Sequence, residues 1–181
     1  MIQRKIFIGI NLPQQVKKRL SQKIERWKEL PIKWTREENF HITLLFLGHV
    51  DDESLLEICE KARLAINEFP IFDIDLSEIS IGPSPQKPQR VWMTGLANET
   101  LKKMEESISK AIGIFVNERK EFRPHVTLGR IQAERWKNLS SQPEINEKFS
   151  VSIPVENVKI FESLIENGRK RYVVLENFPL S

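Results

Sequence analysis

The segment HITLLFLG (41–48) is apolar throughout except for one histidine and one threonine, and it constrains the fold strongly. Such a run predicts a buried strand, in which successive side chains point to opposite faces. Alternation gives one face with His41, Thr43, Leu45 and Leu47, and a second face with Phe40, Ile42, Leu44 and Phe46. Two polar groups therefore share one face of a strand that is otherwise suited to a core.

A second segment, HVTLGR (125–130), repeats the order of histidine, apolar residue, threonine and leucine. The chain contains three histidines and five threonines, so a threonine two places after two of the histidines is unexpected by chance. A single histidine of this kind is usually a core or boundary residue with a satisfied ring. The repetition favours a functional pair instead, with His125 and Thr127 on one face of the second strand.

The segments around the two motifs predict an α+β fold. Alternating strands are expected at 4–12, 72–81, 91–96, 149–154, 156–164 and 171–178, with a type I′ turn at Asn167-Gly168 and a proline-rich loop at 82–90. Helices are expected after Pro13, after Asp51 or Asp52, after Asn98 and around Trp136. Each motif strand then has a helix upstream. This order predicts a single bilobal domain over 1–181, in which two related lobes of mostly antiparallel sheet face each other across a cleft.

Composition narrows the class of protein further. The chain has 181 residues, 40% hydrophobic and 29% charged, which is typical of a globular protein and not of a disordered one. Cys59 is the one cysteine, so an intramolecular disulfide is excluded and a reducing compartment is expected. No secretory signal or bilayer-spanning stretch is evident, so we expect a cytoplasmic monomer without membrane contact.

Two facing imidazoles suggest acid–base chemistry. With ordinary pKa values near ~6.5, one ring can be neutral and the other protonated at physiological pH. One can take a proton from water while the other gives a proton to a leaving oxygen. The hydroxyls of Thr43 and Thr127 could bind phosphate oxygens and stabilise added negative charge. The set suits hydrolysis of a phosphodiester, although the near symmetry of the motifs leaves the acid and the base unassigned.

Other chemistries fit the sequence less well. A histidine zinc site usually needs three protein ligands, and His49, the third histidine, falls at the end of its strand as an expected surface residue. The patterns GxSxG, GxGxxG and the Walker loop are absent. We therefore expect a site that works with no metal and no cofactor.

The chain resembles the two-histidine phosphoesterase superfamily, and within it the RNA 2′,3′-cyclic phosphodiesterase family, also called 2′-5′ RNA ligases. The similarity lies in HITLLFLG and FRPHVTLGR, and also in KIFIGINLP, KWTREENFHITL, RVWMTGL and FESLIENGRKRYVVLENFPL, which follow in the family's order. It covers nearly the whole chain.

The resemblance implies hydrolysis of 2′,3′-cyclic phosphate ends of RNA or nucleotides to 2′-phosphates, with possible reversible 2′-5′ joining of RNA ends. Carried over from the family, His41 is the proton donor and His125 the proton acceptor. The family's arginine after the second motif falls on Arg130. Strict alternation puts Arg130 on the face opposite His125, unless a bulge at Gly129 turns it back.

Further contacts with RNA are open. Phe7, Trp34 and Tyr172 could stack a base, although each also fits a core position. The cations that could follow a phosphate backbone are Lys87, Arg90, Arg119, Lys120, Arg169, Lys170 and Arg171. An alternative from another class is a non-catalytic RNA- or nucleotide-binding protein with a vestigial site, which would not need two titrating imidazoles.

Overall fold

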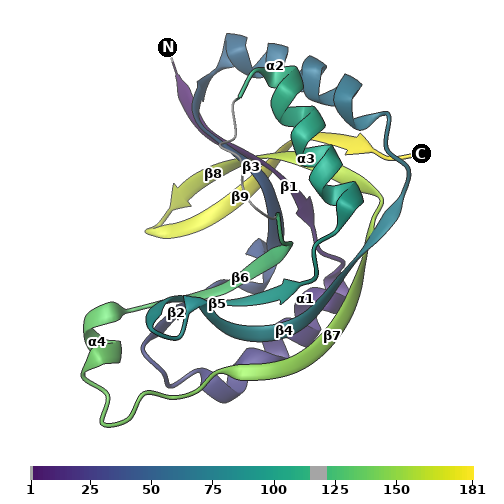
Figure 1. The fold of residues 1–181 in the computed structure, drawn as a ribbon. Coiled ribbons are helices and arrows are strands. Elements are labelled where there is room, and N and C mark those ends of the chain that lie inside the picture. The colour runs from purple at the N-terminus through teal and green to yellow at the C-terminus, as the bar shows by residue number, and fades with distance from the viewer. Residues whose placement is uncertain (1, 115–121) are drawn as a thin grey trace.

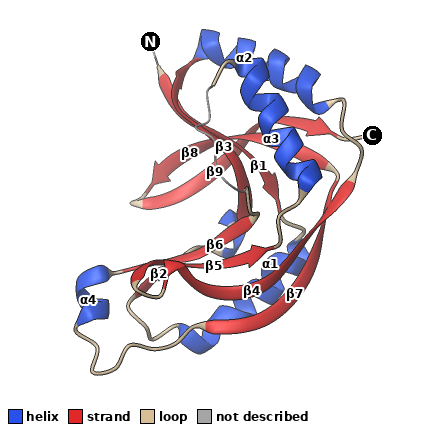
Figure 2. Cartoon of the chain, in the orientation of Figure 1, coloured by secondary structure: helices blue, strands red, loops and turns tan. Residues whose placement is uncertain are grey.

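The computed structural model describes residues 2–114 and 122–181, and its described strands form one nine-stranded sheet in which all pairings are antiparallel (Figures 1 and 2). The strands are β1 Gln3–Asn11, β2 Ile32–Trp34, β3 His41–Asp51, β4 Phe72–Ser84, β5 Lys87–Gly95, β6 His125–Ile131, β7 Asn146–Val155, β8 Asn157–Glu166 and β9 Arg169–Pro179. The predicted α+β class, with its mostly antiparallel sheet and flanking helices, is confirmed.

The strand order is β7-β4-β5-β6-β3-β1-β8-β9, with β2 paired to β6. The two motif strands, β3 and β6, are therefore neighbours at the centre, and each carries its own group of strands outward. Across the described part of the chain, β3 and β6 pair through Ile42 and Val126 alone. Both of these side chains are fully buried. The two halves of the sheet are thus joined at its centre by the pair Ile42–Val126, and we call this junction the seam.

The helices and 3-10 turns are α1 Gln14–Ile24, η1 Glu25–Trp27, η2 Glu37–Asn39, α2 Asp52–Ile66, α3 Glu99–Ile112 and α4 Ala133–Lys137. Asp51 caps α2 by accepting a hydrogen bond from the Ser54 amide (2.8 Å), and Asn98 caps α3 through the Leu101 amide (2.9 Å). Figure 1 shows α2 and α3 side by side over one half of the sheet and α1 over the other half. No helix in the described residues is long and apolar enough to cross a bilayer.

The proline-rich segment 82–90 is not the predicted loop. The strands β4 and β5 continue through it and pair as far as Ser84 and Lys87. Proline favours a loop because it has no amide hydrogen to donate. Here Pro83 and Pro88 face each other next to a register shift, where the ladder is already irregular. The predicted Asn167-Gly168 turn is present, with positive φ angles of 50° and 72° at its two central residues.

Candidate active site

The motif residues lie together on one face of the seam. Because Ile42 and Val126 point into the core, their neighbours in each strand point to the other face, where His41, Thr43, His125 and Thr127 are all half-buried. Continuing the antiparallel register by one residue sets His41 opposite Thr127 and Thr43 opposite His125.

The hydrogen bonds of His41 fix its tautomer. Its Nδ1 is 2.7 Å from the carbonyl oxygen of Asn39, which can only accept, so Nδ1 carries the hydrogen and donates it. In the neutral ring Nε2 is then an acceptor, and the hydroxyl of Thr43 donates to it at 2.8 Å. The basic nitrogen of His41 is therefore held on the site face.

His125 is anchored in the same manner. Its Nδ1 lies 3.3 Å from the carbonyl oxygen of Arg123, two residues upstream, as Asn39 is two residues upstream of His41. Its ring contacts Trp92 on β5, with centroids 5.2 Å apart. Both histidines thus have Nδ1 next to a backbone carbonyl oxygen two residues upstream.

Aromatic side chains enclose His41. The ring centroid of His41 is 4.8 Å from Phe7 on β1, 5.0 Å from Tyr172 on β9 and 6.3 Å from Phe161 on β8. The pKa of His41 is lowered from 6.5 to about 4, mainly by the resulting desolvation and to a smaller extent by the charges of Lys17, His125 and Lys170, against the opposing effect of the Asn39 hydrogen bond. At neutral pH the ring of the free protein is uncharged.

A bulge follows each motif and changes the predicted faces. Thr43 pairs with Gly9 and Leu45 with Ile8, so Leu44 is an extra residue in β3. Leu44 and Leu45 are both buried, whereas Phe46 is 71% exposed and its ring lies near Phe7 on the site face. The prediction of Leu45 on the histidine face and Phe46 on the opposite face is therefore wrong, because strict alternation does not survive a bulge.

Strand β6 has the same kind of bulge, and it changes the face on which Arg130 lies. Thr127 pairs with Trp92 and Gly129 with Val91, which leaves Leu128 as the extra residue. The bulge returns Arg130 to the face of His125 and Thr127. Its charge also lowers the pKa of Lys170 and opposes the rise in the pKa of Tyr172 that burial causes, which places it near the ring that contacts His41.

Arg130 is the middle of a row of cations. In the sheet it is directly opposite Lys33 of β2 on one side and Arg90 of β5 on the other. Directly paired residues share a face, and neighbouring strands lie about 4.8 Å apart. None of the three forms an ion pair within residues 2–114 and 122–181, and Arg90 stacks over Trp92 at 5.6 Å. The row gives this face a positive potential beside the histidines.

Some of the other residues that the sequence suggested for RNA contacts lie at the site, and others do not. Phe7 and Tyr172 contact His41, but Trp34 packs over Gly129 against the core, on the face opposite Lys33. Lys87 is exposed at the start of β5. Arg119 and Lys120 lie outside the described residues.

Four contributors were not identified from the sequence: Lys33, Asn39, Phe46 and Trp92. The short strand of Lys33 has no pattern of its own, and the carbonyl of Asn39 acts whatever its side chain. The position of Trp92 beside His125 depends on strand order. Among the described residues there is no group of three or more histidine, cysteine or acidic side chains that could hold a metal ion.

Known proteins resemble the chain in both sequence and fold. The sequence profile of the LigT like phosphoesterase family matches residues 10–93. The RNA 2′,3′-cyclic phosphodiesterase of Aeropyrum pernix is 32% identical over 153 residues, 81% of this chain and 85% of the relative. The protein of the same name from Thermotoga maritima is 28% identical over 176 residues, 93% and 91% of the two chains.

Solved structures agree with these relatives at the level of the fold. Apo LigT from E. coli superposes with a TM-score of 0.77 at 22% identity, covering 100% of this chain and 99% of its own. The protein TT0787 of Thermus thermophilus superposes with a TM-score of 0.78 at 22% identity, covering 97% of each chain. E. coli LigT is also known in complex with 3′-AMP. The chain belongs to the LigT-like family of two-histidine phosphoesterases, as its sequence motifs predicted.

Proposed function

We propose that the protein hydrolyses 2′,3′-cyclic phosphate ends of RNA to 2′-phosphates, with His41 and His125 as acid and base and without a metal ion. The observation that carries this proposal is the matched anchoring of two imidazoles through Nδ1, with both motif threonines on the same face. The relatives named RNA 2′,3′-cyclic phosphodiesterase support the choice of substrate.

In the proposed reaction a water oxygen attacks phosphorus while Nε2 of His125 takes the water proton. The bond between phosphorus and the 3′-oxygen breaks, and Nε2 of His41 gives its proton to that oxygen. The 2′-phosphate ester remains. This assignment of His41 as the donor follows the family resemblance, because the two motifs are nearly symmetric.

The low pKa of His41 adds a condition to this mechanism. The free protein holds the ring neutral at pH 7, so the ring must gain a proton when substrate binds. A negatively charged phosphate beside Nε2 favours the protonated form and raises the pKa. Protonation also converts Nε2 into a donor, which frees the Thr43 hydroxyl to donate to a phosphate oxygen.

Thr43, Thr127 and Arg130 complete the proposed phosphate site. The two hydroxyls flank the histidines, and Arg130 follows Thr127 after the bulge on the same face. A guanidinium at that place can donate to two phosphate oxygens at once. Donors aimed at developing charge are worth most when they are fixed before the reaction.

The same groups could join RNA ends. If a 5′-hydroxyl replaced water as the attacking group, His125 would take its proton and the product would be a 2′-5′ linkage. Hydrolysis and joining use the same acid and base, so the geometry permits both.

The test is incubation with a 2′,3′-cyclic nucleotide and with an oligonucleotide that ends in a cyclic phosphate, both in EDTA, with the product read by ³¹P NMR. We expect a 2′-phosphate from each substrate. Loss of turnover in EDTA that magnesium or manganese restores would refute the metal-free site. Binding of both substrates without turnover would support the non-catalytic alternative.

A further inference from the structure

A cavity of about 260 Å³ lies between η2 and the tip of the β8–β9 hairpin, next to the residues that contact His41. Asn39 is its link to the catalytic ring. The backbone carbonyl of Asn39 accepts from His41, and its side-chain amide donates to the carbonyl oxygen of Lys170 at 3.0 Å. Tyr172, which also lines the cavity, contacts the His41 ring edge-on. The cavity is thus built from the residues that hold His41.

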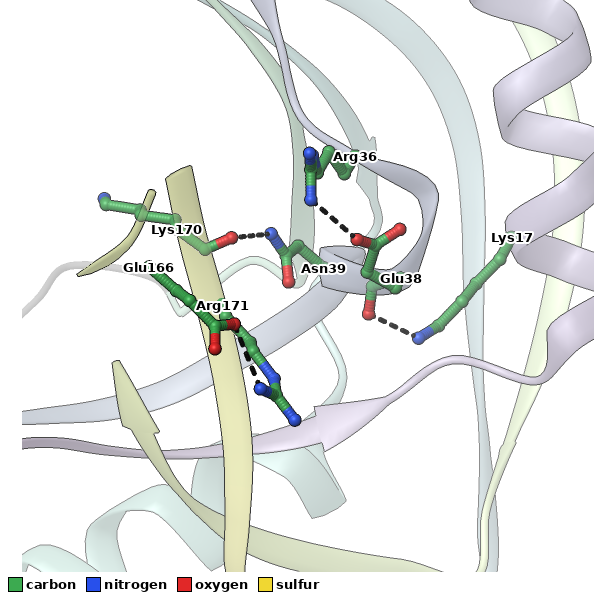
Figure 3. A network of polar contacts seen from close by, with 7 residues as sticks. All are labelled: Lys17, Arg36, Glu38, Asn39, Glu166, Lys170 and Arg171. Carbon is green, nitrogen blue, oxygen red and sulfur yellow. Dashed lines mark hydrogen bonds and ion pairs between the residues drawn. The ribbon is translucent and has the colours of Figure 1, made fainter. Parts of the chain in front are cut away.

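Some charges around this cavity are already paired. Arg36 bonds to Glu38 at 3.3 Å, and Arg171 bonds to Glu166 at 3.0 Å, as Figure 3 shows. Lys170 also lines the cavity and has no acidic partner in the described part of the chain. Its charge is therefore not neutralised by any described side chain.

More positive charge lies close to Lys170. Partial desolvation lowers the pKa of its ammonium, and the nearby charges of Arg130, Lys5 and Lys33 lower it further. Like charges gathered in this manner oppose folding. Their mutual repulsion falls when an anion binds among them. We therefore explain the cluster by ligand binding and not by a contribution to the stability of the fold.

The cluster extends from Arg130, in the proposed phosphate site, to Lys170, which lines the cavity. Lys170 is two residues before Tyr172 on β9, which separates their Cα atoms by about 7 Å. Tyr172 is the residue that contacts His41. Lys170 therefore lies on the cavity side of Tyr172, and Lys33 lies beside Arg130.

We propose that Lys170 and Lys33 bind the phosphodiester that joins the terminal nucleotide of an RNA to the nucleotide before it. The cavity then receives the chain end, and the enzyme acts on RNA ends in preference to free cyclic nucleotides. This inference rests on the proposed function, because it takes the His41–His125 pair as the site of the cyclic phosphate.

The experiment compares kcat/KM for three substrates: a 2′,3′-cyclic mononucleotide, the dinucleotide with the same cyclic end, and that dinucleotide with an uncharged methylphosphonate linkage. We expect wild-type protein to prefer the charged dinucleotide. Lys170→Gln and Lys33→Gln should each reduce kcat/KM for it about tenfold more than for the other two, the scale of one charge-assisted contact.

Two control variants keep the test specific. Lys103→Gln removes an exposed charge from α3 and should leave the substrate preference unchanged. The double variant Glu57→Gln with Lys61→Gln removes an exposed ion pair of α2 without changing the net charge, and it should also keep the preference.

Equal losses on all three substrates, or none, would overturn the inference, because a linkage phosphate is then not recognised. Binding of the dinucleotide that ends in a 2′-phosphate, measured by calorimetry, makes the test independent of turnover. If the wild type turns over no substrate, the proposed function fails, and the effect of Lys170→Gln on this binding still decides the phosphate site.

Discussion

The two HxTL motifs are almost identical in sequence and differ in what surrounds them. His41 is enclosed by Phe7, Phe161 and Tyr172, and its pKa falls to about 4. The ring of His125 instead contacts Trp92 of β5. The neighbouring strands, and not the motif, therefore determine which aromatic rings surround each histidine.

Positions after the bulges show the same contrast. Phe46 follows the first motif and Arg130 the second, at equivalent places. Their partners on the adjacent strands differ in the same sense, since Phe7 is opposite Phe46 and Arg90 is opposite Arg130. The site therefore has an aromatic pair on one half and a cationic pair on the other, so the two halves of a nearly symmetric arrangement differ in chemical character.

The largest expected effect comes from removing either histidine. His41→Ala and His125→Ala should each reduce turnover of a cyclic nucleotide by about 10² to 10⁴, the usual value of a positioned proton-transfer group. A nitrophenyl phosphodiester needs no proton on its leaving group, so His41→Ala should recover much of its rate on that substrate and His125→Ala should not. Recovery by His125→Ala would reverse the roles, and no effect on either substrate would favour a binding protein.

A second expected difference is in the pH dependence of stability. The pKa of His41 is lower in the folded protein than the 6.5 of an unfolded chain, so the unfolded state binds more protons between these values. Stability should rise with pH from about 4 to 6.5, and the loss at pH 4.5 relative to pH 7 should be about 2 kcal/mol from this group. Urea unfolding of wild type and His41→Asn at both pH values measures it. An equal pH dependence in the two proteins would contradict the lowered pKa.

The two threonines should differ in their effect on the free protein. The Thr43 hydroxyl donates to Nε2 of His41, whereas Thr127 makes no side-chain hydrogen bond to a described residue. Thr43→Val and Thr127→Val should each reduce kcat about ten- to hundredfold through lost phosphate contacts. Only Thr43→Val should also shift the ¹⁵N resonances of the His41 ring without substrate. A matching shift in Thr127→Val would show that the two half-sites are alike.

The smallest expected effect concerns Phe46. At 71% exposure, Phe46→Gln should change the free energy of unfolding by less than about 0.5 kcal/mol. In the core, where strict alternation puts it, the same change would cost about 3 kcal/mol or more. Arg130→Gln, its counterpart in the other half, should be similarly neutral for stability but reduce kcat/KM about tenfold. Thermal unfolding and steady-state kinetics on the two variants separate these cases.

Much of the fold was predictable because it depends on short-range patterns. The two-residue repeat of a strand puts the side chains of His41 and Thr43 on one face. The helix caps at Asp51 and Asn98 each act within one turn of their helix. The bulges were not predictable in register, because the partner strands decide where a ladder skips a residue. For that reason strict alternation assigns Phe46 to the wrong face and leaves the face of Arg130 dependent on a bulge.

The site was predictable only in its motif residues. The enclosure of His41 depends on β9, more than a hundred residues later in the chain, so its low pKa has no local sequence signal. The same is true of Lys33, whose place beside Arg130 exists only because β2 pairs with β6. Both features depend on pairing between strands that are far apart in the sequence, which a short motif does not indicate.

The single residue pair that joins β3 to β6 also has a mechanical consequence. A sheet bends most easily where the fewest hydrogen bonds cross between neighbours, and in the described strands that line runs between the rings of His41 and His125. A change in the angle between the two halves would therefore alter the separation of the two Nε2 atoms before it broke any other strand pairing.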